Sequence, residues 1–212
     1  MLLQLFDQPQ LLIILIFCLI FALSLHEFAH ALVANWCGDS TAKMLGRLTT
    51  NPMAHLDPFG ALMLLMVGFG YAKPVPVNPR NFRFRNADFY VAAAGPGMNL
   101  LLGIASGLLW RMISGAGVYE FLGMPLDVLF FWFMFINFNL CLFNLIPLGP
   151  LDGSYVLPHF LPRDLQRRYE VWNERFGGQL LMGLVALSLI LPGFSAFRWI
   201  SSFSRSLVSW AA

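Results

Sequence analysis

Long apolar runs separated by short polar segments dominate the pattern of this chain. The first run begins near Leu11 and continues to Trp36, the second covers Ala87 to Ile113, and the third covers Leu126 to Ile146. A helix needs about 20 residues to cross a bilayer, and each of these runs is long enough. A fourth run, Gln179 to Leu191, stops before Pro192. The pattern therefore predicts about four transmembrane helices.

Three shorter patterns differ from these spans. Phe59–Tyr71 is apolar and contains glycines, and as a helix it would extend only about 20 Å, so we interpret it as a re-entrant segment. From Phe197 to Trp210, apolar residues recur every three or four positions, which is typical of an interfacial helix or of a kinked span that continues. In Lys73–Asn78, prolines at alternate positions enforce an extended backbone.

The composition agrees with a membrane protein. Of 212 residues, 58% are hydrophobic and 11% are charged, whereas a soluble domain carries roughly 25% charged residues. The net charge of +2 is too small to suggest nucleic-acid binding. No Lys or Arg precedes the first run, so we expect a retained helix rather than a signal peptide. The predicted fold is an all-α polytopic membrane protein, one domain over residues 1–212, with small extended or β elements.

Three ionisable side chains, His26, Glu27 and His30, interrupt the first apolar run in the sequence HEFAH. On a helix the two histidines lie one turn apart on the same face. This is the H-E-x-x-H pattern in which two histidines hold zinc and the glutamate acts on a water molecule. A charged group inside a membrane-length helix costs a few kcal/mol on insertion scales, so such groups indicate a functional site. A lone buried histidine would be an ordinary core residue, but the full pattern favours a metal site.

A catalytic zinc ion needs a third protein ligand, and several residues are candidates. They are His55, His159, Asp57, Asp88, Asp127 and Asp152. Asp88 and Asp127 lie at helix starts, where a carboxylate suits the helix dipole, and Asp57 before Pro58 is typical of a turn. Asp152 follows a helix interrupted by prolines, where the freed backbone must line protein or a cavity. An Asp-Gly turn would give the same letters, so both interpretations stay open at this point.

Two motifs together resemble the site-2 protease family of intramembrane zinc metalloproteases. They are HEFAH on the first core helix and NLIPLGPLDG at the end of a later one. The segments NPMAHLDPFG, YAKPVPVNPRNF and AGPGMN resemble the compact branch of that family, which lacks an inserted PDZ domain. The resemblance extends from about His26 to Gly153. We accordingly divide the chain into a catalytic core over about 10–157 and C-terminal helices over about 158–212.

The resemblance implies a set of site residues and an activity. One zinc ion per chain would be held by His26, His30 and Asp152. Glu27 would be the general base, Asn144 would help to position substrate or stabilise the oxyanion, and His55 matches a family histidine near the site. The implied reaction is hydrolysis of peptide bonds within or near transmembrane segments. The expected partners are a membrane protein with a transmembrane helix and the lipid bilayer, with no nucleic acid; no oligomeric state is predicted.

The basic residues predict the orientation of the site. If Phe59–Tyr71 is re-entrant, the loops 36–58, 72–86 and 154–178 share one side and hold ten Lys and Arg residues, against Arg111 alone at the border of the opposite loop. If it spans, the same residues divide as eight against three. The positive-inside rule therefore favours re-entrance and an active site toward the cytoplasmic side, in the cell membrane.

The rival interpretation is a non-hydrolytic membrane protein with a metal site, such as a metal transporter or a scaffold. Transporters often have inverted repeats and polar residues along several helices, whereas here the polar groups converge and no repeat is evident. A scaffold without hydrolytic activity would most easily lose Glu27, and the presence of this residue therefore argues against a scaffold. Lys73–Asn78 could pair with an unwound substrate strand or simply cover the site, and the sequence does not choose between these roles.

Overall fold

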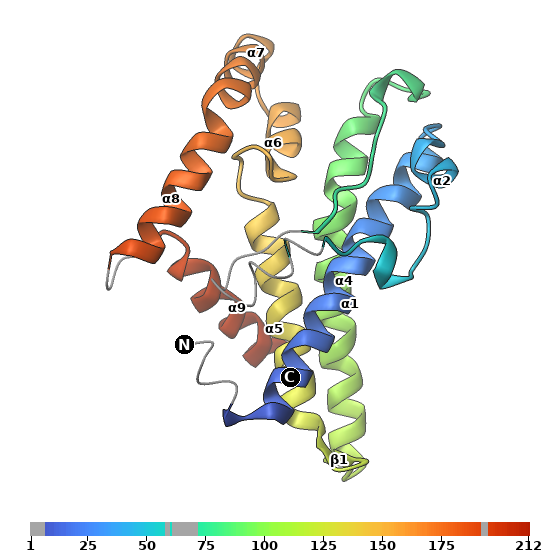
Figure 1. The fold of residues 1–212 in the computed structure, drawn as a ribbon, viewed down its shortest axis with the longest axis vertical. Coiled ribbons are helices and arrows are strands. Elements are labelled where there is room, and N and C mark those ends of the chain that lie inside the picture. Colours follow the sequence, from blue (N-terminus) through green and yellow to red (C-terminus); the bar gives the residue numbers. More distant parts are fainter. Residues whose placement is uncertain (1–6, 58–59, 61–71, 192–194) are drawn as a thin grey trace.

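Three long helices form the centre of the molecule. The computed structural model describes residues 7–57, 60, 72–191 and 195–212. Within these residues, α1 (Pro9–Trp36), α4 (Ala87–Gly115) and α5 (Leu126–Asn144) are long and apolar enough to cross a membrane. Each packs against the other two, and α4 runs antiparallel to α1 and α5 (Figure 1). The predicted all-α membrane fold is confirmed.

The fourth predicted span forms a helix of the predicted length, which is short for crossing a bilayer. The apolar run forms α8 (Gly178–Ile190), whose 13 residues extend about 20 Å. It continues without a break from α7 (Arg163–Trp172) through a π-helical turn, η5 (Asn173–Gly177) (Figure 1). The preceding turns are polar and the chain leaves helical geometry at Leu191, so the apolar length is limited at both ends.

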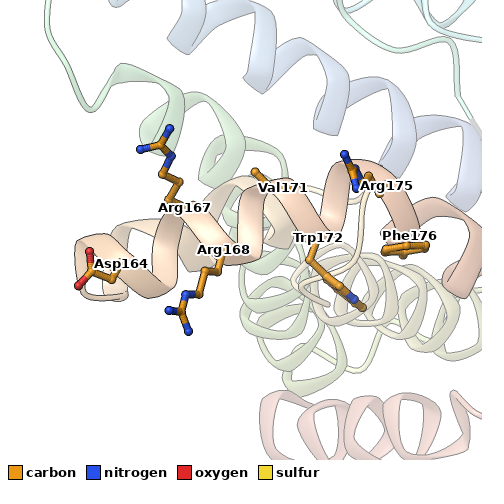
Figure 2. Close-up of a pocket in the computed structure, with 7 residues that line it drawn as sticks. All are labelled: Asp164, Arg167, Arg168, Val171, Trp172, Arg175 and Phe176. Carbon is orange, nitrogen blue, oxygen red and sulfur yellow. The ribbon is translucent and has the colours of Figure 1, made fainter.

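The outer surface of α7 is basic and aromatic. Figure 2 shows Arg167, Arg168 and Trp172 on this helix, with Arg175 and Phe176 in its continuation, η5. All five side chains are exposed. Among the described residues no ion pair is recorded for these arginines. This helical surface therefore presents exposed arginines beside the exposed carboxylates of Asp164, Glu170 and Glu174.

The C-terminal amphipathic segment forms α9 (Arg198–Ala211), which packs on α5 and α4. Its Val208 and Ala211 are buried against Met134 and Phe138 of α5. The opposite face exposes Trp199, Phe203 and Trp210. The predicted helix is therefore confirmed, and one of its faces belongs to the bundle.

The short elements gather at the two ends of the bundle. They are α2 (Thr41–Met44), η2 (Pro52–Ala54), η3 (Pro79–Asn81), β1 (Glu120–Phe121), β2 (Met124–Pro125), α6 (Gly153–Val156) and η4 (Leu157–Phe160). The antiparallel pair β1–β2 lies at one end of the bundle, and α2, α6 and α7 lie toward the other (Figure 1). The loop after α1 and the loop before α4 meet, because Arg83 N–H donates to Cys37 O at 2.9 Å. The prediction of a re-entrant Phe59–Tyr71 falls, Gly60 apart, outside the described residues.

Candidate metal centre

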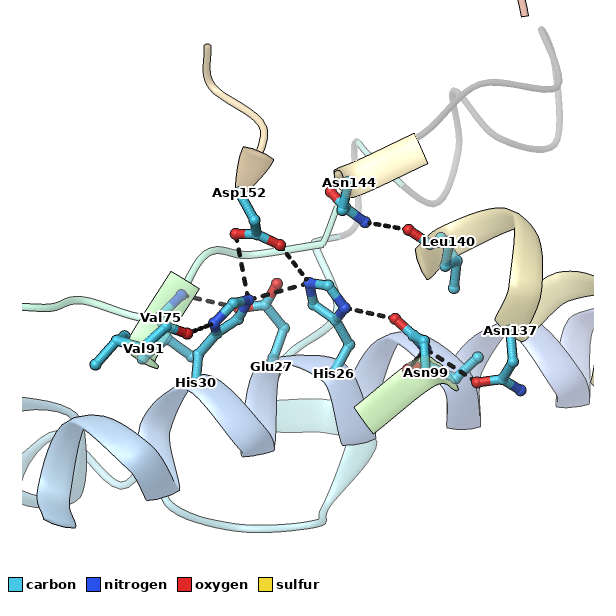
Figure 3. A network of polar contacts seen from close by, with 11 residues as sticks. His26, Glu27, His30, Val75, Val91, Asn99, Asn137, Leu140, Asn144 and Asp152 are labelled. Atoms are coloured by element: carbon cyan, nitrogen blue, oxygen red, sulfur yellow. Dashed lines mark hydrogen bonds and ion pairs between the residues drawn. The ribbon is translucent and has the colours of Figure 1, made fainter. Parts of the chain in front are cut away.

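Three predicted ligands from distant parts of the chain meet in one place. The Nε2 atoms of His26 and His30 on α1 lie 3.1 Å apart. Asp152, which follows α5, places one carboxylate oxygen 3.2 Å from His26 Nε2 and the other 3.4 Å from His30 Nε2 (Figure 3). Both histidines are buried. Among the described residues, these three form the group of histidine and carboxylate side chains that could hold a metal ion.

The helix α4 determines which ring nitrogen of each histidine carries a proton. His30 Nδ1 lies 2.7 Å from Val91 O, a carbonyl that can only accept, so this nitrogen donates. His26 Nδ1 lies 2.6 Å from Asn99 Oδ1. The Asn99 amide is oriented by its nitrogen, which donates to Ala22 O and to Asn137 Oδ1, so its oxygen accepts from His26. In neutral imidazoles both Nε2 atoms are therefore left with lone pairs.

The resulting cluster consists of acceptors that face one another. Two Nε2 lone pairs and an ionised carboxylate share the space, and none of the described residues donates a hydrogen bond to the buried Asp152 Oδ2. A cation satisfies all of these atoms, whereas a single added proton would satisfy only one histidine contact. Ligands 2.0–2.2 Å from a tetrahedral zinc ion are about 3.3–3.6 Å apart, close to the three observed separations. The residues therefore fit zinc.

Gly95 on α4 gives the histidines the room they need. A Cβ atom at this position would lie 2.3 Å from His30 Nε2 and 2.5 Å from His26 Nε2, closer than Cβ contacts allow. The helix backbone thus approaches the face of the site where a metal would sit. Any side chain at this position would compete for the same space.

The loop after α5 brings Asp152 back to the bundle. Pro147 and Pro150 prevent the helix from continuing. Gly153 lets the loop close onto the helix end, because a Cβ atom at this position would lie 2.3 Å from Leu145 O. Burial raises the pKa of the Asp152 carboxyl, but the two histidines beside it lower the pKa to about 2. Asp152 is therefore an ionised group.

The same loop is tied to the helix that follows it. Tyr169 on α7 donates its hydroxyl hydrogen to Pro147 O at 3.0 Å, and Asn173 Oδ1 in η5 accepts from Gly149 N–H at 2.7 Å. These two hydrogen bonds hold the segment on the Asp152 side of the cluster. The position of Asp152 thus depends on residues from two elements, α5 and the α7–η5 helix.

Glu27 lies beside the cluster on α1. Its carboxylate is buried, and Oε2 accepts a hydrogen bond of 3.0 Å from Val75 N–H (Figure 3). In Figure 3 the carboxylate lies on the same side of the helix as the two imidazoles. A carboxylate in this position can accept a proton from a water molecule held at the cluster.

Two further predicted residues form their hydrogen bonds away from the cluster. Asn144 ends α5, and its side-chain amide donates to Leu140 O at 3.0 Å. His55 is buried, with Nε2 2.8 Å from Thr49 O, and its Nδ1 has no partner among the described residues. The structure therefore brings together three of the predicted site residues, places Glu27 beside them, and does not join His55 to them.

The sequence interpretation missed the residues of α4 that support the histidines. Asn99, Val91 and Gly95 all face the site, yet only the AGPGMN segment drew attention to this helix. A polar Asn99 inside an apolar helix, four residues after Gly95, is the signal that could have identified this face. The backbone oxygen of Val91 leaves no signal in the sequence.

Comparisons with known proteins agree with this geometry. The model of Peptidase family M50 matches residues 14–128 and 112–184. The chain is 43% identical over 151 residues, 70% of this chain and 69% of the relative, to "Putative zinc metalloprotease YwhC" of Bacillus subtilis (strain 168). It is 27% identical over 159 residues, 66% of this chain and 55% of the relative, to "Putative zinc metalloprotease Rip2" of Mycolicibacterium smegmatis. No solved structure gives a significant match.

The family match covers most of the chain and includes the segments that contribute His26, Glu27, His30 and Asp152. The expected resemblance is confirmed by this match and by the relative at 43% identity. The chain therefore belongs to Peptidase family M50, the site-2 protease family that its motifs resemble, and it is an enzyme of that metalloendopeptidase class.

Proposed function

We propose that this protein is a zinc-dependent endopeptidase that hydrolyses peptide bonds within or near transmembrane segments of membrane proteins. One observation carries the proposal: the acceptor-only cluster of His26, His30 and Asp152 lies beside a buried carboxylate, Glu27, in an apolar helical bundle. The names of both relatives, zinc metalloproteases, support zinc as the metal. We propose one zinc ion per chain, held by these three side chains.

The side chains have distinct tasks in this reaction. Zinc, when bound, polarises the scissile carbonyl and makes water a stronger nucleophile at neutral pH. Glu27 accepts the proton of the attacking water and passes it to the leaving amine. Its Oε2 is held by Val75 N–H, which keeps the carboxylate directed at the cluster. Asn99 and Val91 O keep the Nδ1–H tautomers of the histidines, so that both Nε2 atoms remain ligands.

The depth of the site supports cleavage inside the bilayer. His26 lies ten residues before the C-terminal end of α1, which corresponds to about 15 Å along the helix axis. His30 is six residues from this end, or about 9 Å. The hydrocarbon core is about 30 Å thick, so both residues fall between its surface and its middle if α1 spans.

The distribution of charge supports a cytoplasmic orientation in the cell membrane. The end of the bundle that holds α2 and α7 carries the exposed arginines of α7, whereas the β1–β2 pair at the other end contains no Lys or Arg (Figures 1 and 2). Cytoplasmic loops carry an excess of these residues. We therefore propose that the loop with Asp152 faces the cytoplasm.

The proposed substrate is a membrane protein whose transmembrane helix unwinds before cleavage. A helix has its amides bonded internally, so no scissile carbonyl is open to attack until a turn is lost. We propose that Asn144 assists the developing oxyanion after its amide leaves Leu140 O. His55 holds its Nε2 at Thr49 O, and its role in the reaction stays a prediction.

Cleavage of a membrane-segment substrate by the purified protein tests the proposal. Glu27→Gln is expected to lower kcat by at least about 1,000-fold while zinc content stays at that of the wild type, because the variant loses the base but no ligand. Asp152→Ala is expected to lose zinc, and Asp127→Ala, which alters a carboxylate at the start of α5, serves as its matched control. Equal turnover by wild type and Glu27→Gln would refute the peptidase mechanism and favour a transporter or scaffold.

A further inference from the structure

The buried carboxylate of Glu27 accepts a hydrogen bond from a proline-rich segment, residues 74–76, which has one backbone N–H group. The contact is Val75 N–H to Glu27 Oε2, at 3.0 Å. Val75 lies between Pro74 and Pro76, and neither proline has an N–H group. Among residues 74–76, the N–H of Val75 is thus the single backbone donor, and Glu27 receives it.

The prolines also stiffen the backbone that presents this donor. Each fixes its own φ near −65° and biases the residue before it toward extended geometry. Pro74, Val75 and Pro76 therefore have few alternative conformations to lose when the carboxylate is bound. An N–H held in this way is pre-organised for its acceptor.

Polar side chains after α1 anchor the segment at both ends. Buried Arg47 donates from Nη1 to Pro74 O at 3.1 Å and from Nη2 to Lys73 O. At the other end, buried Asp39 accepts from Asn78 N–H at 2.7 Å. The two anchors lie on either side of Val75, so the segment cannot move along α1 without breaking one of them.

A third anchor comes from the backbone of His55. Its carbonyl oxygen accepts from Lys73 N–H at 2.8 Å, next to the carbonyl groups that Arg47 holds. Together these contacts fix the position of the Val75 N–H relative to Glu27, and they act on the carboxylate through the segment.

We propose that Val75 N–H is the group that orients Glu27 for proton transfer and that Arg47 is a positioning residue acting through this segment. The proposal rests on the proposed role of Glu27 as general base. One oxygen, Oε2, is occupied by the Val75 N–H, which leaves Oε1 to take the proton from water. Without the hydrogen bond, the carboxylate can rotate, and fewer molecules hold Oε1 in the reactive direction.

The test compares Val75→Pro, which removes the N–H, with Val75→Ala, which keeps it and removes most of the side chain. Proline suits the extended segment because its neighbours are already prolines. Val75→Pro is expected to lower kcat by about 10- to 100-fold relative to Val75→Ala, with KM within about twofold and zinc content unchanged. Equal kcat in the two variants, or zinc loss in Val75→Pro alone, would overturn the proposal.

Arg47 offers an independent test if Val75→Pro does not fold. Arg47→Met is expected to lower kcat by about tenfold with zinc retained, and Arg47→Lys to restore part of it, whereas Arg80→Met, at an exposed arginine of η3, leaves kcat unchanged. A kcat for Arg47→Met equal to that of Arg80→Met would overturn the proposal.

Hydrogen exchange gives a readout that does not depend on activity. Residues 74–77 contain two backbone N–H groups, those of Val75 and Val77. The Val75 amide is expected to exchange at least about tenfold faster in Arg47→Met and in Glu27→Ala than in the wild type. An unchanged rate would refute the positioning role. Failure of the proposed function would instead show as a wild type that cleaves no better than Glu27→Gln.

Discussion

Replacement of Gly95 by alanine should disturb the metal centre more than any other glycine-to-alanine substitution in α4. The new Cβ would lie 2.3 Å from His30 Nε2, and contacts shorter than 3.0 Å are essentially never seen, so the imidazole or the helix must move by at least 0.7 Å. His26 Nε2, at 2.5 Å, must move by at least 0.5 Å. Zinc–nitrogen bonds tolerate deviations of only about 0.2 Å.

This displacement is expected to weaken zinc binding by about 10- to 100-fold, which corresponds to about 1.4–2.7 kcal/mol. The control is Gly97→Ala, two residues along the same helix, whose Cβ would meet nothing within 4 Å. Both variants gain the same helix propensity, up to about 1 kcal/mol, so their difference isolates the contact with the histidines.

The assay is competition for zinc between a chelator of known affinity and each purified variant in detergent or nanodiscs. Gly95→Ala should lose zinc at a lower chelator concentration than Gly97→Ala, and the apo forms should unfold at similar temperatures. If the two variants hold zinc within twofold of each other, the close approach of α4 does not shape the site, and our reasoning about Gly95 is wrong.

Two further predictions concern hydrogen bonds that support the site. Asn99→Leu should weaken zinc binding by about 10- to 100-fold because His26 Nδ1–H loses its acceptor, while Asn99→Asp should recover part of the loss; equal affinities in the chelator assay would contradict the tautomer argument. Burial raises the pKa of Asp39, but hydrogen bonds from Thr41, Asn78 and Asn81 lower it by more, below its unfolded value. Its carboxylate therefore stabilises the fold above the unfolded pKa, and this contribution is lost as pH falls through the folded pKa. In thermal unfolding at pH 7, 5 and 3, the stability gap between wild type and Asp39→Asn should narrow with falling pH; a constant gap would contradict it.

The sequence could predict the parts of the fold and site that depend on local pattern. Apolar length predicted α1, α4 and α5, and the i, i+4 spacing placed His26 and His30 on one face. The resemblance then pointed to Asp152, which the structure places at both imidazoles. Helical periodicity and residue chemistry can be determined from a short stretch of sequence, even when the structure of the rest of the chain is unknown.

The supporting contacts could not be predicted in this way. The pair His30–Val91 is separated by 61 residues and His26–Asn99 by 73, and both depend on how α4 is rotated against α1. The contact of Val75 with Glu27 involves a backbone N–H, a group that every residue except proline carries, so the residue type does not indicate it. The place of His55 near the site stays a prediction, and its local contact, Nε2 at Thr49 O, could not be predicted from the motif.

The loop of Asp152 is joined to the next helix by two hydrogen bonds, one from Tyr169 to Pro147 O and one from Gly149 N–H to Asn173 Oδ1, and these couple metal binding to the placement of α7 and α8. If this helix has two placements, and only one holds the loop against the histidines, zinc binds more tightly to that one. Thermodynamic linkage is reciprocal, so loading with zinc favours that placement by the same factor by which the placement favours zinc. A lipid or protein that shifts α8 would then change the metal affinity from a distance. Removal of zinc by a chelator would in turn change the placement of the outer surface of this helix.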